Sequence, residues 1–101
     1  MGKQHQDVRM SSQTVRVLET FLENPARELA GAEVQRHGNL GPGTLYPVLL
    51  RLEAAGWFVS RWESAVVADV QRPRRRLYRL TSNGLARASA VFADFGQGVP
   101  A

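Results

Sequence analysis

Cysteine is absent from this sequence of 101 residues. Its absence excludes disulfide scaffolds, thiolate metal sites and cysteine nucleophiles, and it fits a reducing compartment. Long apolar runs are absent too, because none approaches the roughly 18 residues that a membrane-spanning helix needs. Residues 1–7 contain no apolar stretch of the kind that directs secretion. We therefore expect a soluble, cytoplasmic protein with no membrane partner.

Histidine is scarce as well, with two copies, His5 and His37. Neither lies in a pattern of serine or carboxylate side chains that could form a catalytic triad or a metal site. With cysteine absent, no other arrangement of catalytic groups stands out in the sequence. We therefore expect that the chain is not an enzyme and that it uses no metal and no cofactor.

Apolar residues make up 44% of the chain, enough for one small hydrophobic core. Residues 1–10 are polar and aperiodic, and we expect a flexible tail there. The spacing of apolar residues predicts three helices, over residues 11–23, 30–37 and 42–54. The first helix has Ser11 or Ser12 as its N-cap, and the second buries Ala32 and Val34. The third helix carries one apolar stripe, made of Leu45, Val48, Leu49 and Leu52.

Two β-rich runs follow the third helix, at residues 57–62 and 77–80. They predict a hairpin with a long basic connection, because the residues between them are rich in arginine. Side chains alternate between the two faces of a strand, so Tyr78 and Leu80 should share one face.

A last helix is expected over residues 81–96, with Thr81 as its cap, and residues 97–101 are expected to form a second tail. The order helix, helix, helix, hairpin, helix is that of a winged helix-turn-helix. We therefore expect a mainly α (α+β) fold, in which residues 11–80 form a three-helix core with a β-hairpin wing. The last helix is the expected dimerisation helix.

Positive charge is concentrated in one part of the chain. Six of the thirteen Lys and Arg residues lie between Arg61 and Arg79, facing only Glu63 and Asp69, whereas the rest of the chain carries seven charges of each sign. The net charge of +4 therefore belongs to this stretch. Like charges at such close spacing repel one another, which favours a polyanionic partner over an ordinary solvated surface. The expected contacts with the DNA backbone are Arg72, Arg74, Arg75 and Arg76.

The third predicted helix has the position of a recognition helix, which lies in the major groove with its first residues at the base edges. Its candidate DNA-binding residues are Gly43, Thr44, Tyr46, Pro47 and, one turn further on, Arg51. Hydroxyl groups suit phosphate oxygens, and glycine lets the backbone approach the duplex closely. Arg51 could make a bidentate contact with guanine, which contributes about 1–3 kcal/mol of discrimination. The alternatives are that Tyr46 is a core aromatic and that Arg51 is an ordinary solvated residue.

Three sequence motifs resemble those of the PadR family of bacterial transcriptional regulators, over about residues 12–95. They are Gly43-Thr44-Leu45-Tyr46-Pro47, Arg51-Leu52-Glu53 with Gly56, and the run from Arg72 to Thr81. The resemblance implies a winged helix-turn-helix that binds operator DNA as a homodimer, usually as a repressor released by a small molecule. It also implies that the recognition positions are Thr44, Tyr46, Pro47 and Arg51 and that the wing carries Arg74, Arg75 and Arg76.

Two features depart from that family's usual pattern. The apolar segment 65–70 replaces the glycine-rich, polar wing that is typical of the family. The alternative interpretation of this segment is a longer hairpin or an exposed apolar surface that favours association. The single short last helix resembles the compact branch of the family, which lacks a large C-terminal domain. A ligand pocket would then have to lie at the dimer interface.

The last helix predicts self-association. Its apolar stripe has few partners once the three-helix core is closed, and a second copy is the simplest cover. The expected interface residues are Leu85, Ala88, Val91, Phe92 and Phe95. A twofold dimer would place two recognition helices roughly 34 Å apart, the spacing of successive major grooves. We therefore expect a sequence-specific regulator of transcription, a repressor that binds a near-palindromic site on double-stranded DNA as a homodimer.

A second class of function fits the same sequence. The winged helix could bind a partner protein through the apolar segment 66–70 instead of binding DNA, and DNA binding that is absent or insensitive to salt would favour this alternative. The two tryptophans differ in their expected roles. Trp57 follows directly after a helix end and is expected in the core, whereas Trp62 could stack against a small aromatic effector.

Overall fold

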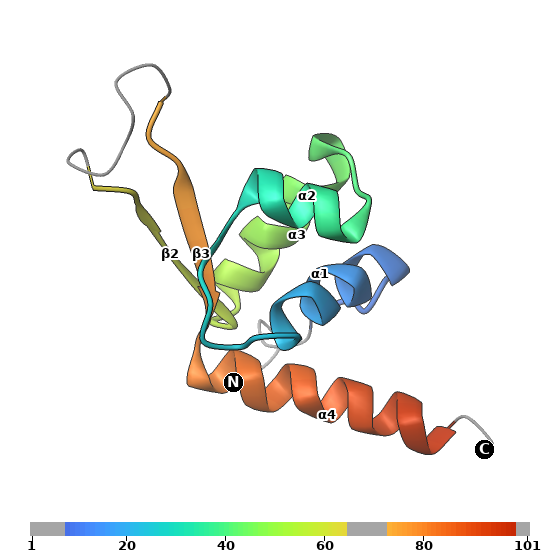
Figure 1. Ribbon diagram of the computed structural model, residues 1–101. Coiled ribbons are helices and arrows are strands. Elements are labelled where there is room, and N and C mark those ends of the chain that lie inside the picture. Colours follow the sequence, from blue (N-terminus) through green and yellow to red (C-terminus); the bar gives the residue numbers. More distant parts are fainter. Residues whose placement is uncertain (1–7, 65–72, 99–101) are drawn as a thin grey trace.

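The computed structural model describes residues 8–64 and 73–98, with side chains described as far as Ala93 (Figure 1). In chain order the elements are α1 (Ser12–Leu22), β1 (Leu29–Ala30), α2 (Gly31–Gly38), α3 (Pro42–Ala54), β2 (Phe58–Trp62), β3 (Arg76–Leu80) and α4 (Ser82–Gly98). Over the described ranges this is the mainly helical α+β fold that the sequence predicted, with four helices and a three-stranded antiparallel sheet. No helix in those ranges is long and apolar enough to cross a membrane.

Helices α1, α2 and α3 gather on one side of the sheet and enclose the core (Figure 1). Helix α1 begins at the predicted N-cap, because the Ser11 hydroxyl accepts a hydrogen bond of 3.2 Å from the Thr14 amide. Its apolar face buries Val17, Leu18 and Phe21 completely. Phe21 also reaches the sheet, where its ring centroid lies 4.6 Å from that of Phe58. The core therefore joins the helices to the base of the hairpin.

Helix α2 differs in one respect from the prediction. Val34 is fully buried as expected, but Ala32 is exposed, so its assignment to the core is wrong. The buried alanine is Ala30, which belongs to β1 and directly precedes the helix. Glu33 accepts a 2.8 Å hydrogen bond from the Ala30 amide and so caps the helix, and Asn39 ends it in the left-handed region at φ 55°.

The sheet has the strand order β1-β3-β2, with β3 paired antiparallel to both neighbours. The hairpin of β2 and β3 confirms the predicted wing, and Tyr78 and Leu80 of β3 are both buried as their alternation required. Strand β1 was not expected from the sequence. It consists of two residues, which is too short for any period-2 pattern to show.

Helix α4 begins against the turn between α3 and β2. Thr81 caps it, as predicted: its hydroxyl accepts a 2.9 Å hydrogen bond from the Gly84 amide and also contacts the carbonyls of Gly56 and Trp57 at 2.7 and 3.1 Å. The helix then runs beneath α1 (Figure 1) and continues past Gly96, where we expected it to end.

Candidate nucleic-acid interface

Helix α3 is buried along the predicted stripe and exposed along the rest of its length. Leu45, Leu49 and Leu52 are fully buried and Val48 is 3% exposed, which confirms all four core assignments. The candidate DNA-binding residues of this helix all lie on its exposed part, namely Gly43, Thr44, Tyr46, Pro47 and Arg51. Leu50 shares this surface with 64% exposure, which the sequence did not reveal because a leucine beside a core stripe resembles a core residue.

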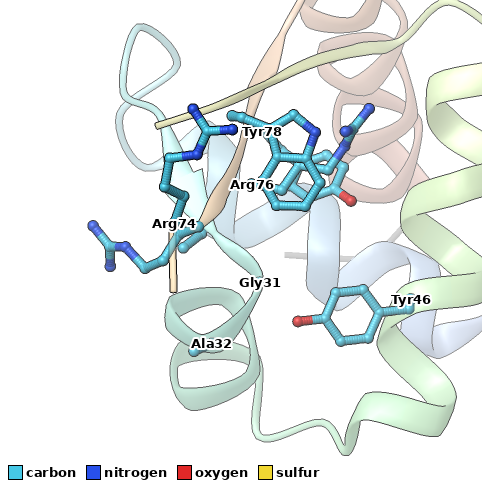
Figure 2. Close-up of a pocket in the computed structure, with 9 residues that line it drawn as sticks. Gly31, Ala32, Tyr46, Arg74, Arg76 and Tyr78 are labelled. Carbon is cyan, nitrogen blue, oxygen red and sulfur yellow. The ribbon is translucent and has the colours of Figure 1, made fainter. Parts of the chain in front are cut away.

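Tyr46 is 40% exposed, and its ring lies against the start of α2 (Figure 2). The ring approaches Gly31 so closely that a Cβ at position 31 would lie 2.8 Å from the Tyr46 Cε1 and Cζ atoms. Glycine at position 31 therefore makes room for the tyrosine, and the contact holds the ring between α2 and α3. Tyr46 is thus a surface aromatic supported from one side, which differs from the alternative that it is a core aromatic.

A pocket of about 360 Å³ separates Tyr46 from the wing (Figure 2). It is bordered by Gly31 and Ala32 at the start of α2, by Tyr46 on α3, and by wing residues that include Trp62 and Arg74. The fold therefore brings the predicted recognition helix and the predicted wing to opposite sides of one hollow.

Two arginines of the basic stretch are neutralised by carboxylates from within the chain. Arg61 donates from Nε and Nη2 to the two carboxylate oxygens of Glu28, each at 2.7 Å. These hydrogen bonds lower the pKa of the Glu28 carboxyl and raise the pKa of the Arg61 guanidinium. Arg75 donates from Nε and Nη2 to Glu63 Oε2 at 3.1 and 3.0 Å, which raises the pKa of Arg75. Glu63 is 5% exposed and also accepts a 3.0 Å hydrogen bond from the Arg75 amide.

Arg76 is also engaged within the protein. Its Nε donates to the Ser60 hydroxyl at 3.0 Å, its Nη2 lies 3.9 Å from Glu53 Oε2, and its guanidinium carbon lies 5.2 Å from the centre of the Trp62 ring. Beneath it, burial raises the pKa of the Tyr78 hydroxyl.

Arg74 is the arginine with the clearest access to a partner. It is exposed, it borders the pocket, and it forms no ion pair within residues 8–64 and 73–98. Arg79 is exposed as well, but it lines a separate hollow together with Leu85. Arg72 and the apolar segment 65–70 lie outside the described residues. The arginines look equivalent along the sequence, whereas the fold separates the exposed Arg74 and Arg79 from the others of the described stretch, which are paired with carboxylates: Arg61, Arg75 and Arg76.

The two tryptophans have different environments. Trp57 is 3% exposed and belongs to the core, as predicted, whereas Trp62 is 53% exposed at the pocket. The guanidinium of Arg76 lies over the Trp62 ring, 5.2 Å from its centre.

The predicted dimer residues on α4 are divided between the core and the surface. Ala88 is fully buried against the core of its own subunit, so it is not available to a partner and its assignment to an interface is corrected. The reason is that α4 packs on α1, which gives this part of the stripe a cover within the chain. Val91 and Phe92 are half-buried against the same core, and Leu85 is 38% exposed. The side chain of Phe95 lies outside the described residues.

Residues 28–90 match the transcriptional regulator PadR-like family, and this span is more than half of the chain. It runs from Glu28, before β1, into α4 and therefore contains the pocket, α3 and the wing. The chain belongs to the PadR-like family, as the sequence motifs indicated. Because the family consists of transcriptional regulators, its membership also agrees with the expectation that the chain is not an enzyme.

Individual relatives support the same assignment. The transcriptional regulator Rv3488 of Mycobacterium tuberculosis is 51% identical over 55 residues, which are 54% of this chain and 47% of the relative. The overoxidized form of AbfR, a protein of Staphylococcus epidermidis, was solved bound to DNA and superposes with a TM-score of 0.72 at 27% identity. That match covers 90% of this chain and 61% of AbfR. The chain thus spans less than two thirds of the length of either protein.

A PadR family regulator from Clostridium difficile shows the same fold. It superposes with a TM-score of 0.70 at 18% identity, over 84% of this chain and 88% of the relative. Identity this low supports the fold and nothing more specific. The winged helix-turn-helix is therefore shared with a relative whose sequence has diverged widely.

Proposed function

We propose that this chain is a sequence-specific regulator that binds double-stranded DNA through α3 and the wing. The observation that carries the proposal is the pocket geometry, in which the exposed face of α3 and the arginine-bearing wing border one hollow. A duplex lying against α3 would bring its backbone beside the wing, because the two elements of a winged helix contact adjoining parts of the DNA. AbfR, which shares this fold, has been solved bound to DNA in its overoxidized and reduced forms.

The contacts divide into phosphate and base contacts. Thr44 and Tyr46 offer hydroxyl groups to phosphates. Gly43 has no side chain and Pro47 has a small one, which lets the start of α3 approach the duplex closely. Arg51 presents a guanidinium that can make a bidentate contact with guanine. On the wing, Arg74 supplies the accessible cation, and Arg72 extends the basic run. Arg75 supports the wing through its ion pair with the buried Glu63 and adds a weaker, partly neutralised field.

The regulator acts as a homodimer on a near-palindromic operator, and it acts as a repressor. The exposed Leu85 and the partly exposed Val91 and Phe92 of α4 are the surface that a second copy would cover, together with Phe95. Twofold symmetry of the protein then imposes twofold symmetry on the site that it reads. The operator of a bacterial regulator lies in the cytoplasm, so a cytoplasmic location is part of the proposal.

A small planar aromatic effector would bind beside Trp62. The 53% exposure of this ring and its place at the pocket support the idea, since a ligand there would compete with DNA for the space between wing and recognition helix. Titration of a panel of aromatic compounds should quench the tryptophan emission of the wild type and not that of Trp62→Phe. Equal quenching in both proteins would place the ligand elsewhere.

The salt dependence of DNA binding tests the proposed function. The affinity for duplex DNA should fall steeply with salt, with a slope of about −0.9 for each phosphate neutralised, and Arg74→Ala should remove about one such unit. Arg87→Ala is the matched control, because it deletes the same charge from the exposed face of α4 and should leave the slope unchanged. Absent binding, or binding that ignores salt, would contradict the proposal and favour a protein partner.

A further inference from the structure

A chain of polar contacts joins the recognition helix to the wing. The Ser60 hydroxyl on β2 donates to Glu53 Oε2 on α3 at 2.6 Å, and it accepts from Arg76 Nε on β3 at 3.0 Å. Arg76 Nη2 completes the connection at 3.9 Å from the same Glu53 oxygen. We call these three residues the helix–wing network. It ties α3 to both strands of the hairpin through side chains alone.

The network is reinforced on its open side by an aromatic ring. Trp62 lies beside Arg76 at 5.2 Å, within the range of a cation–π contact. The Arg76 side chain is 39% exposed and the Glu53 side chain 29% exposed, so both are partly shielded from water. The Ser60 hydroxyl acts both as a donor, to Glu53, and as an acceptor, from Arg76.

The contacts of Arg76 within the protein distinguish it from an arginine that is free to bind phosphate. Arg74, two residues earlier, forms no ion pair in the described part of the chain and is more exposed, although both arginines belong to the same basic run. Moving Arg76 onto a phosphate would leave the Glu53 carboxylate without its nearby cation and would remove a hydrogen bond from Ser60. Phosphate binding by Arg76 therefore competes with contacts that it already makes.

We propose that Glu53, Ser60 and Arg76 form a coupling between α3 and the wing, and that Arg76 is a positioning residue that does not itself contact phosphate. The inference deepens the proposed DNA binding and rests on it for its functional consequence. A helix that contacts base edges and a wing that contacts the DNA backbone can bind the same duplex only if the angle between them fits the DNA. The helix–wing network sets this angle within the protein. Glu53 lies two residues after Arg51 near the C-terminal end of α3, so a shift of the helix at the network also moves Arg51, the proposed guanine contact.

The first arm of the test separates positioning from phosphate binding. Arg76→Gln and Arg74→Gln remove the same charge from neighbouring positions, and each is measured for affinity to a selected DNA site at several salt concentrations. We expect Arg76→Gln to weaken binding by about 2- to 30-fold with the salt slope retained. Arg74→Gln should reduce the slope by about 0.9. An equal reduction of the slope in Arg76→Gln would identify it as a phosphate contact and overturn the proposal.

The second arm tests coupling. Glu53→Gln keeps the size of the side chain and loses its charge, and it should weaken specific binding although a carboxylate near DNA is otherwise unfavourable. In the double variant the two losses should not add, because either change already breaks the network. Additive losses would show that the residues act independently and would contradict the inference.

A third arm needs no DNA and separates failure of the inference from failure of the proposed function. Acrylamide quenching reports the accessibility of Trp62, since Trp57 is buried. Glu53 is not itself the residue stacked on Trp62, yet Glu53→Gln should raise the quenching constant by releasing Arg76 and loosening the wing, with the circular dichroism of the helices retained. Unchanged quenching would overturn the coupling. If Glu53→Gln raises the quenching constant as expected but the wild type binds no DNA, the proposed function is refuted and the coupling between α3 and the wing stands.

Discussion

Gly84→Ala should destabilise the protein, because no space exists for a side chain at the start of α4. A Cβ at this position would collide with the Trp57 carbonyl oxygen and would lie 2.7 and 2.9 Å from the Trp57 carbonyl carbon and Cα. These are backbone atoms, so they cannot turn aside as a side chain could. The first turn of α4 must therefore move away from the turn between α3 and β2.

The cost follows from the contacts that hold this junction. Moving the helix weakens the 2.9 Å hydrogen bond from the Thr81 amide to the Trp57 carbonyl and the 2.7 Å bond from the Thr81 hydroxyl to Gly56. Two such bonds are worth about 2 kcal/mol, and overpacking costs about 1–3 kcal/mol more. The better helix propensity of alanine returns about 1 kcal/mol. We expect a net loss of about 2–4 kcal/mol in the free energy of unfolding.

Urea unfolding followed by circular dichroism measures this loss as a lower midpoint at an unchanged m-value. Gly43→Ala is the matched control, since it makes the same change near the start of another helix where no heavy atom lies within 4 Å. The control should be neutral or more stable by up to about 1 kcal/mol. If Gly84→Ala were as stable as the control, the tight docking of α4 would be wrong.

Three further outcomes are expected. Leu85→Asp changes an exposed residue of the subunit and should leave folding largely intact, but it should convert the proposed dimer to a monomer in sedimentation velocity; an unchanged mass would remove Leu85 from the interface. The hydrogen bond from Arg61 lowers the pKa of Glu28 in the folded protein. The pair of Glu28 and Arg61 therefore contributes to stability at a pH above the pKa of Glu28 in the unfolded chain, and this contribution is lost as the pH falls through the pKa of Glu28 in the folded protein. Between about pH 6 and pH 3 the urea midpoint should therefore fall less in Glu28→Gln than in the wild type. An identical fall in both proteins would show that the ion pair does not contribute to stability. Gly31→Ala should displace the ring of Tyr46 and weaken DNA binding, and adding it to Tyr46→Ala should cause no further loss of affinity; a further loss would mean that Gly31 acts by another route.

Local signals in the sequence were sufficient for most of the helices and the hairpin. The stripe of α3 and the hydroxyl caps at Ser11 and Thr81 are properties of short segments, and the structure confirms them. Gly56, which follows the end of α3 and belongs to one of the sequence motifs, adopts φ 83°, a conformation that favours glycine. Such features depend on residues only a few positions apart, so a single sequence reveals them.

Contacts between distant segments were not predictable in the same way. The partner of Arg61 is Glu28, 33 positions away, and the partner of Arg76 is Glu53 on another element. A count of charges along the chain places these arginines in one basic run, whereas the fold distributes carboxylates among them. The burial of Ala88 was missed for the same reason, because the packing of α4 on α1 depends on the tertiary arrangement.

Selection of bound fragments from random or genomic DNA would show whether this chain recognises a DNA sequence as a twofold dimer. We expect the full chain to enrich an inverted repeat whose half-sites lie one helical turn apart, about 10 base pairs, and Arg51→Ala to relax the preference at one guanine in each half-site. Recovery of fragments with no shared sequence, at the same yield for the wild type and for Arg51→Ala, would contradict this expectation.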